Sequence, residues 1–219
     1  MFKDEPLLTT ALLLTIVTLT GCASSPAKLE FAGESTNAQY SQNFTRAYFS
    51  MSEEGEYDVV LNEDGIKAAP ASPTGPIATA AATAPLKQTV HIRIRWRPLR
   101  GGKPDAPTAT NAVIDWYVRS NDPSETDFLH YRGAGFVGIY GSDPEARFVI
   151  RSSHLELASH HGRLTDPLGP CSVTGSIVAT RSDSQVTSIL SQLREQFASQ
   201  TGPRPVPLDG PPPRVPSTP

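Results

Sequence analysis

The sequence predicts an α+β fold that is mainly antiparallel β, arranged as a meander, a sandwich or a partial barrel, with one amphipathic helix near its C-terminal end. Apolar and polar residues alternate in short runs, and turn sequences such as Gly141-Ser142-Asp143-Pro144 separate the runs. This pattern is typical of strands that follow one another in an antiparallel sheet. Parallel βαβ units are not expected, because no helical pattern separates the runs.

The chain begins with an apolar run over residues 7–19, which ends in Leu19-Thr20-Gly21-Cys22. A run of about 13 residues has the length of the hydrophobic core of an export signal. At about 1.5 Å per residue it reaches ~20 Å, which is too short to cross the ~30 Å hydrocarbon core of a bilayer. The flank departs from an export signal, because the acidic Asp4 and Glu5 directly follow Lys3. The alternative is a short buried helix in which Cys22 is a core thiol.

The four residues Leu19-Thr20-Gly21-Cys22 resemble the lipobox of bacterial lipoproteins. In that family, small and apolar residues precede a cysteine that is lipidated and becomes the mature N-terminus. The resemblance implies a signal peptide over 1–21, lipidation of Cys22 and a membrane anchor at the cell envelope. Ala23 replaces the Asp that retains such proteins at the inner membrane of enteric bacteria, which implies the outer membrane. With Cys22 acylated, Cys171 has no cysteine with which to form a disulfide.

Composition divides the mature chain into four parts. Residues 22–43 are small and polar, which indicates a spacer, and residues 44–200 hold the alternating segments of one β-rich domain. Within that domain, residues 67–85 are mostly Ala, Pro and Thr. Burial there cannot offset a backbone entropy of about 1–2 kcal/mol per residue, so we predict a flexible insert. The proline-rich residues 201–219 are predicted to be a disordered tail.

Nine segments have the composition of strands. They are residues 44–51, 57–61, 89–97, 112–119, 128–131, 135–140, 147–151, 154–158 and 172–180. The alternation is strictest over 89–97, where the even positions are apolar and the odd positions are basic. The predicted core face is Val90, Ile92, Ile94 and Trp96. If the next strand pairs with this one, Asp115 is available to the basic face.

One helix is predicted over residues 183–200. Ser182 and Gln185 have the spacing of a capping box, and Gly202-Pro203 ends the helical pattern. The apolar positions form one stripe, which we expect to pack against the sheet. They are Val186, Ile189, Leu190, Leu193 and Phe197.

Several motifs that could carry chemistry do not fit their surroundings. The glycine string at 133–138 matches a dinucleotide-binding pattern, but that mechanism needs a helix start and the segment has the composition of a strand. We interpret the glycines as relieving crowding or marking a bulge. His160 and His161 are adjacent, so on a strand they point to opposite faces and do not form a chelating pair. The chain has no Gly-x-Ser-x-Gly string of a serine hydrolase, and the spacing of its Asp and Glu residues does not decide whether an acid–base pair is present. From these motifs we predict no catalytic residue, metal or cofactor.

The basic face of 89–97 is the candidate binding site, because an anion placed across it would relieve the repulsion between neighbouring like charges. The predicted set is His91, Arg93, Arg95, Arg97, Arg100 and Lys103. The candidate ligands are lipid headgroups, acidic envelope polymers or an acidic protein surface. The alternative is a solvated face that Asp115 and other carboxylates neutralise. A net charge of −3 argues against a nucleic-acid partner.

These observations predict an envelope lipoprotein with a membrane anchor and a non-catalytic structural or interaction role. A second hypothesis is a carrier or assembly factor of the outer membrane that holds a lipid or an anionic ligand in a partial barrel. An envelope hydrolase is the third.

Overall fold

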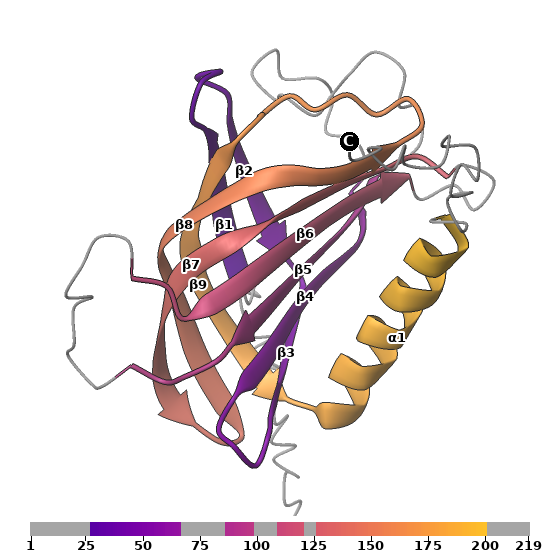
Figure 1. The fold of residues 1–219 in the computed structure, drawn as a ribbon. Helices are drawn as coiled ribbons and strands as arrows, with labels where there is room; N and C mark the ends of the chain where they lie inside the picture. Colours follow the sequence, from indigo (N-terminus) through magenta and orange to yellow (C-terminus); the bar gives the residue numbers. More distant parts are fainter. Residues whose placement is uncertain (1–26, 67–85, 99–108, 121–125, 201–219) are drawn as a thin grey trace, which may run out of the picture.

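The computed structural model describes residues 27–66, 86–98, 109–120 and 126–200, and within them the chain forms nine strands and one helix (Figure 1). The strands are β1 (Ala27–Gly33), β2 (Gln39–Phe44), β3 (Arg46–Met51), β4 (Tyr57–Ile66), β5 (Leu86–Ile94), β6 (Ala112–Ser120), β7 (Phe128–Ser142), β8 (Glu145–His161) and β9 (Cys171–Arg181). The helix α1 spans Asp183–Gln200. The predicted signal peptide 1–21, Cys22, the insert 67–85, Arg100, Lys103 and the tail 201–219 lie outside the described residues.

The strands form a closed barrel. The sheet order is β2-β1-β9-β3-β4-β5-β6-β7-β8, and β8 also pairs with β9, which joins the seven strands β3 to β9 into a ring. All pairings are antiparallel except the short parallel contact between β3 and β9. The predicted α+β class with mainly antiparallel strands is confirmed, and of the three predicted arrangements the strands adopt the barrel.

The predicted spacer is wrong from residue 27 onwards, because β1 and β2 form a hairpin there that pairs with β9. Ala27, Leu29 and Phe31 alternate with exposed Lys28 and Glu30, and all three apolar side chains are buried. This is the period-2 pattern of a half-buried strand. The hairpin therefore belongs to the folded domain, and four residues separate Cys22 from its first residue, Ala27.

Strands β7 and β8 are longer than the sequence indicates. Each joins two of the predicted short strands, and bulges occur between His130 and Tyr131 and between Phe136 and Val137. The predicted dinucleotide string lies inside β7. A Cβ added at Gly133 would lie 1.8 Å from the carbonyl oxygen of His154 on β8, so only glycine fits there. The interpretation that these glycines relieve crowding is confirmed.

Aromatic side chains fill the barrel. Trp116 stacks between Phe31 and Tyr131, with ring centroids 4.0 and 4.9 Å away, and its Nε1 donates to Oε1 of Gln88 at 3.1 Å. Nearer the other end, edge contacts join Phe148 to two further buried rings. Because the rings are almost fully inaccessible to water, the core is packed at both levels.

The predicted faces of residues 89–97 are correct along β5 and fail after it. Val90, Ile92 and Ile94 are buried as predicted, but Trp96 is 48% exposed. The strand ends at Ile94, so the alternation no longer determines where Trp96 points. Its ring instead contacts the edge of Phe136 on β7.

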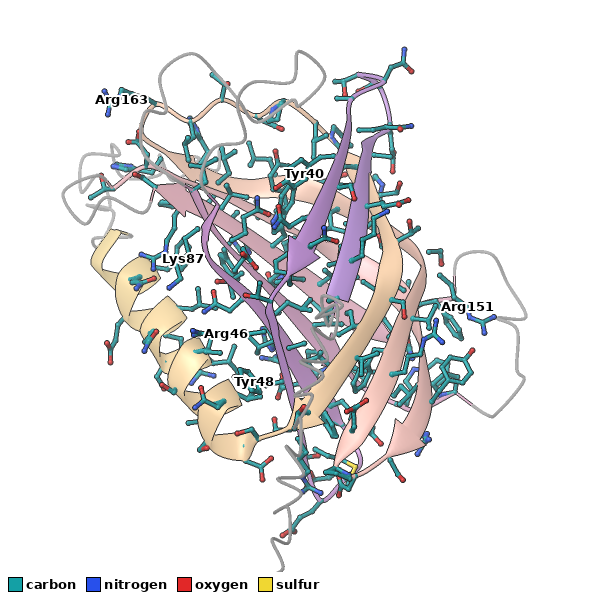
Figure 2. All side chains as sticks on the ribbon, turned by 180° about the vertical axis from the view of Figure 1, so that it is seen from behind. Tyr40, Arg46, Tyr48, Lys87, Arg151 and Arg163 are labelled. Carbon is teal, nitrogen blue, oxygen red and sulfur yellow. The ribbon has the colours of Figure 1, made fainter. Side chains whose placement is uncertain are left out.

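Helix α1 packs along the outer wall of the barrel (Figure 1). Oγ of Ser182 accepts a hydrogen bond from the backbone nitrogen of Gln185 at 3.4 Å, which caps the helix as predicted. Val186 and Leu193 on the apolar stripe are buried. Arg46 and Lys87 lie on this side of the barrel, whereas Arg151 lies on the opposite side (Figure 2).

Candidate functional site

A groove of about 350 Å³ lies between the second half of α1 and the outer wall of the barrel. Strands β5, β6 and β7 provide its floor, and α1 provides one side. Its polar lining includes His91, Arg93, Asp115, His130, Arg132, Ser159 and Arg194, and its apolar lining includes Phe128, Leu190, Leu193 and Phe197. The floor is polar because the odd positions of β5 and β6 and the even positions of β7 point away from the barrel interior.

Two histidine–carboxylate pairs lie in or beside this groove. Nε2 of His91 is 2.7 Å from Oδ1 of Asp58, and Nε2 of His130 is 2.8 Å from Oδ1 of Asp115. His91 and Asp115 are buried, and His91 stands opposite Asp115 in the pairing of β5 with β6. The two pairs are therefore adjacent on the sheet. Buried polar groups of this kind are stable because each has a hydrogen-bond partner.

Arginines surround both carboxylates. Nε of Arg93 lies 3.4 Å from Oδ1 of Asp58, and Nε of Arg132 lies 3.6 Å from Oδ1 of Asp115. The hydrogen bond from His91, with the charge of Arg93, lowers the pKa of Asp58. Burial and the nearby charge of Asp115 raise the pKa of Tyr117 to about 12. At neutral pH an ionised Asp58 therefore lies beside the groove, and the phenol of Tyr117 within the groove is neutral.

Ser159, His130 and Asp115 contact one another in the order Ser–His–Asp, as in the catalytic triad of serine hydrolases. Oγ of Ser159 is 3.4 Å from Nδ1 of His130, and Nε2 of the same ring faces Asp115. In serine hydrolases, Nε2 contacts the serine and Nδ1 contacts the carboxylate. Here the two nitrogens are exchanged, and 3.4 Å is long for a hydrogen bond. These two contacts orient the His130 ring, which also stacks on Tyr117 with ring centroids 4.4 Å apart. The arrangement does not by itself predict hydrolysis.

Three guanidinium groups line the groove: Arg93 on β5, Arg132 on β7 and Arg194 on α1. Arg93 and Arg132 each share a carboxylate with a histidine. Within the described part of the chain, Arg194 has no hydrogen bond or ion pair to a side chain and is exposed to solvent. Three cations thus stand beside two carboxylates, so the groove has an excess of positive charge and an apolar side.

The basic residues predicted to form one binding face, which we call the basic row, do not lie together in the structure. His91 and Arg93 both line the groove. Arg95 instead pairs with Glu56 at 3.2 Å, and Nη2 of Arg97 donates to the carbonyl oxygen of Gly141 at 3.1 Å. The row therefore does not form one site. Sequence reasoning missed Arg132 and Arg194, because their place beside Arg93 depends on strand register and on helix packing.

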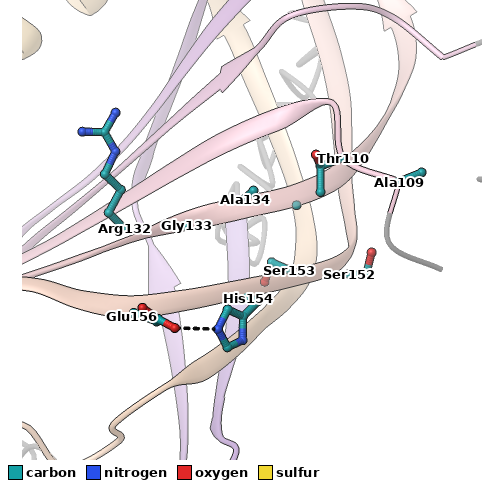
Figure 3. A pocket seen from close by; sticks show the side chains of 10 residues that line it. Ala109, Thr110, Arg132, Gly133, Ala134, Ser152, Ser153, His154 and Glu156 are labelled. Carbon is teal, nitrogen blue, oxygen red and sulfur yellow. Dashed lines mark hydrogen bonds and ion pairs between the residues drawn. The ribbon is translucent and has the colours of Figure 1, made fainter. Parts of the chain in front are cut away.

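A second, shallower hollow of about 610 Å³ lies on the outer wall of β7 and β8 (Figure 3). His154 stands at one edge, with Nδ1 2.6 Å from Oε1 of Glu34 and Nε2 3.2 Å from Oε1 of Glu156. The hydrogen bonds that the ring nitrogens donate to the carboxylates of Glu34 and Glu156 raise the pKa of this exposed histidine. Its lining also includes Gly133, Gly135 and the polar residues Thr110, Arg132, Ser152 and Ser153.

Comparisons with family models, with curated proteins and with solved structures find no match for this chain. Among the described residues, no group of three His, Cys, Asp or Glu side chains is placed to hold a metal ion. In the same part of the chain, no helix has both the length and the apolar character needed to cross a membrane.

Proposed function

We propose that this chain is a lipid-anchored lipoprotein of a bacterial cell envelope, held at the outer membrane through Cys22, with a binding role and no catalytic role. Its ligand is an anionic group of an envelope polymer or of a partner protein. The groove beneath α1 holds that group. The lipobox resemblance supports the anchor, and the geometry of the groove supports the binding role.

The observation that carries the binding role is the convergence of Arg93, Arg132 and Arg194 on one groove. They come from two strands and a helix, so the fold, and not a local run of basic residues, brings them together. Planar guanidinium groups bind carboxylates and phosphates through paired hydrogen bonds. Arg194 has no such partner in the described residues and is available to a ligand.

The anchor is tested by expressing the full chain in a bacterium with a fatty-acid probe. The wild-type chain should carry the label and fractionate with membranes, and Cys22→Ser should lose the label. A label that persists on Cys22→Ser would contradict lipidation at this residue.

The groove is tested by replacing Arg93, Arg132 and Arg194 together with Gln. The triple variant should bind less to isolated sacculi, and its binding should depend less on salt, because fewer charges are screened. The matched control is Arg95→Gln, which removes an arginine already paired with Glu56. Equal retention of the triple variant and the control, with unchanged thermal unfolding of both, would refute the groove as the binding site.

A carrier of an anionic amphiphile is the second candidate function. Because aromatic rings fill the barrel at the levels of Trp116 and Phe148, such a ligand would occupy the groove instead. The apolar side chains of Leu190 and Phe197 beside the arginines favour a ligand with a hydrocarbon part. Native mass spectrometry of the Cys22→Ser chain should then show a retained lipid, and a bare chain mass would favour the polymer or protein ligand.

A further inference from the structure

The exposed apolar side chains of the described residues gather at one end of the barrel. Four large ones are exposed, Trp96 by 48%, Tyr140 by 42%, Val178 by 38% and Met51 by 37%. Each lies at or just beyond the end of β5, β7, β9 or β3. All four strands end on the same side of the barrel, because neighbouring strands are antiparallel and β3 runs parallel to β9. We call this end the rim.

The contacts across the rim are specific. Tyr140, Arg147 and Val178 stand opposite one another on β7, β8 and β9. Met51 and Arg97 line a hollow of about 120 Å³ together with Gly141. The ring of Tyr140 lies over Gly138, and its hydroxyl accepts a hydrogen bond from Arg151.

Three arginines stand among these apolar groups, and their hydrogen bonds go to neutral acceptors. Arg97 donates to the carbonyl oxygen of Gly141, Arg147 donates to Oγ of Ser176 at 2.9 Å, and Arg151 donates to Tyr140. Within the described residues, no carboxylate pairs with any of the three. The carboxylates at this end are elsewhere engaged or apart: Asp143 in the β7–β8 turn pairs with Arg181, Glu145 begins β8, and Glu53 and Glu54 lie in the β3–β4 turn.

The position of β1 limits which end of the barrel a lipid on Cys22 can reach. Ala27 on β1, Ile177 on β9, Phe148 on β8 and Ile139 on β7 pair in turn and form one row across the sheet. Tyr140 is one residue beyond this row. The end of β9 at Arg181 is four residues beyond this row, roughly 13 Å at about 3.3 Å per residue. The five Cα-to-Cα steps from Cys22 to Ala27 span at most ~18 Å.

The short distance from Ala27 to Cys22 limits which end of the barrel can face the bilayer when Cys22 carries the proposed lipid. Strand β1 runs away from the rim, and its last residue, Gly33, is a further six residues from Cys22. An anchor on Cys22 therefore reaches just past the rim and cannot reach past the opposite end. The rim is the end of the barrel that faces the bilayer.

We propose that the rim is a membrane-docking surface, in which Trp96, Tyr140 and Met51 enter the headgroup region while Arg97, Arg147 and Arg151 bind lipid phosphates. Amphipathic aromatic rings concentrate at membrane–water interfaces, and guanidinium groups near the surface are attracted to anionic lipids. This inference rests on the proposed lipid anchor. It places the groove beneath the second half of α1 away from the bilayer, where an envelope polymer or partner protein has access to it.

Trp96 provides a direct test, because the chain has two tryptophans and the other, Trp116, is fully buried. The acylated protein is purified from bacterial membranes and reconstituted into vesicles of phosphatidylglycerol and phosphatidylcholine with brominated acyl chains. These lipids should quench a large part of the tryptophan fluorescence. Trp96→Phe should remove the quenched part and leave the emission of Trp116.

The matched arginine variants are Arg151→Gln at the rim and Arg95→Gln, whose guanidinium group is paired with Glu56. Quenching should decrease in Arg151→Gln when phosphatidylglycerol is present and should not change in Arg95→Gln. A protein that carries the fatty-acid label but whose quenching equals that of Trp96→Phe would overturn the docking surface and leave the anchor intact. Absence of the label from the wild-type chain would overturn both.

Discussion

The two tryptophans of the chain have opposite environments. Trp116 is fully buried between two aromatic rings and donates a hydrogen bond to Gln88, whereas Trp96 lies beyond the end of β5 with about half of its surface in water. Mutations at these two positions therefore test the packing of the core against that of the rim.

Trp116→Ala should lower the free energy of unfolding by about 3–5 kcal/mol, because it leaves a cavity in a packed core. Trp96→Ala should lower it by only about 1–2 kcal/mol, since half of its ring is exposed and its loss leaves no enclosed cavity. Urea unfolding monitored by far-ultraviolet circular dichroism measures both. A larger loss for Trp96→Ala than for Trp116→Ala would contradict the assignment of the two faces.

His154 is expected to titrate above the ordinary value of 6.5, because Glu34 and Glu156 stabilise its protonated ring. Since the folded pKa is raised, this contribution to stability is present below about pH 6.5 and is lost as the pH rises through the folded pKa. The effect should be small, because solvent screens an exposed pair. NMR titration should give a higher pKa in the wild type than in Glu34→Gln, and equal values would contradict the pairing.

At the scale of elements, α1 is held to the barrel by a few apolar side chains. Leu193 is buried on the side of α1 that lines the groove, and Phe197 lies against Tyr117 and Phe128. The helix therefore both stabilises the domain and forms one side of the candidate site.

Leu193→Ala should destabilise the protein by about 2–4 kcal/mol, through lost burial and a residual cavity. Glu195→Ala, an exposed neighbour on the same helix, should stay within about 0.5 kcal/mol of the wild type. Thermal unfolding of both variants checks the difference. Similar melting temperatures would show that α1 is not packed as described.

The sequence predicted most elements well because alternation and turn residues are local signals. It predicted breaks within β7 and β8, since glycines and small polar residues interrupt the pattern near the positions where the pairing of these strands shifts register. It missed β1 and β2, although Ala27, Leu29 and Phe31 alternate correctly, because the small polar composition around them has the character of a spacer.

The candidate site was only partly predictable from the sequence. The basic row identified His91 and Arg93 and anticipated Asp115 beside them. The other members come together through the register of β6 with β7 and through the packing of α1, which place Asp115 opposite Arg132 and bring Arg194 over the sheet. A single sequence contains no direct record of such non-local pairings.

At the scale of the whole molecule, the accessibility of the Cys171 thiol indicates whether the barrel is closed. It is buried at the start of β9, where it pairs with Gly33 on β1 and Leu155 on β8. Burial raises the pKa of its thiol to about 12, so the reactive thiolate is scarce in the folded protein.

In the Cys22→Ser chain, Cys171 is the remaining thiol. It should react with a thiol reagent only at the rate of global unfolding, because both neighbours of β9 must separate to expose it. Mass spectrometry after timed labelling, with a guanidinium-unfolded sample as the control, measures this rate. Rapid labelling under native conditions would show that β8 and β9 separate locally, without global unfolding.

The placement of β9 also affects the order in which the protein can be made. The strand that closes the ring, and that pairs with β1, β3 and β8, is the last strand along the chain. At a synthesis rate of ~5–20 residues per second, the first strands are made several seconds before β9. Such distant pairings also form slowly once the whole chain is present. If the chain is exported as proposed, it must remain unfolded until it has crossed the membrane, and a barrel that cannot close before β9 has been made satisfies that condition.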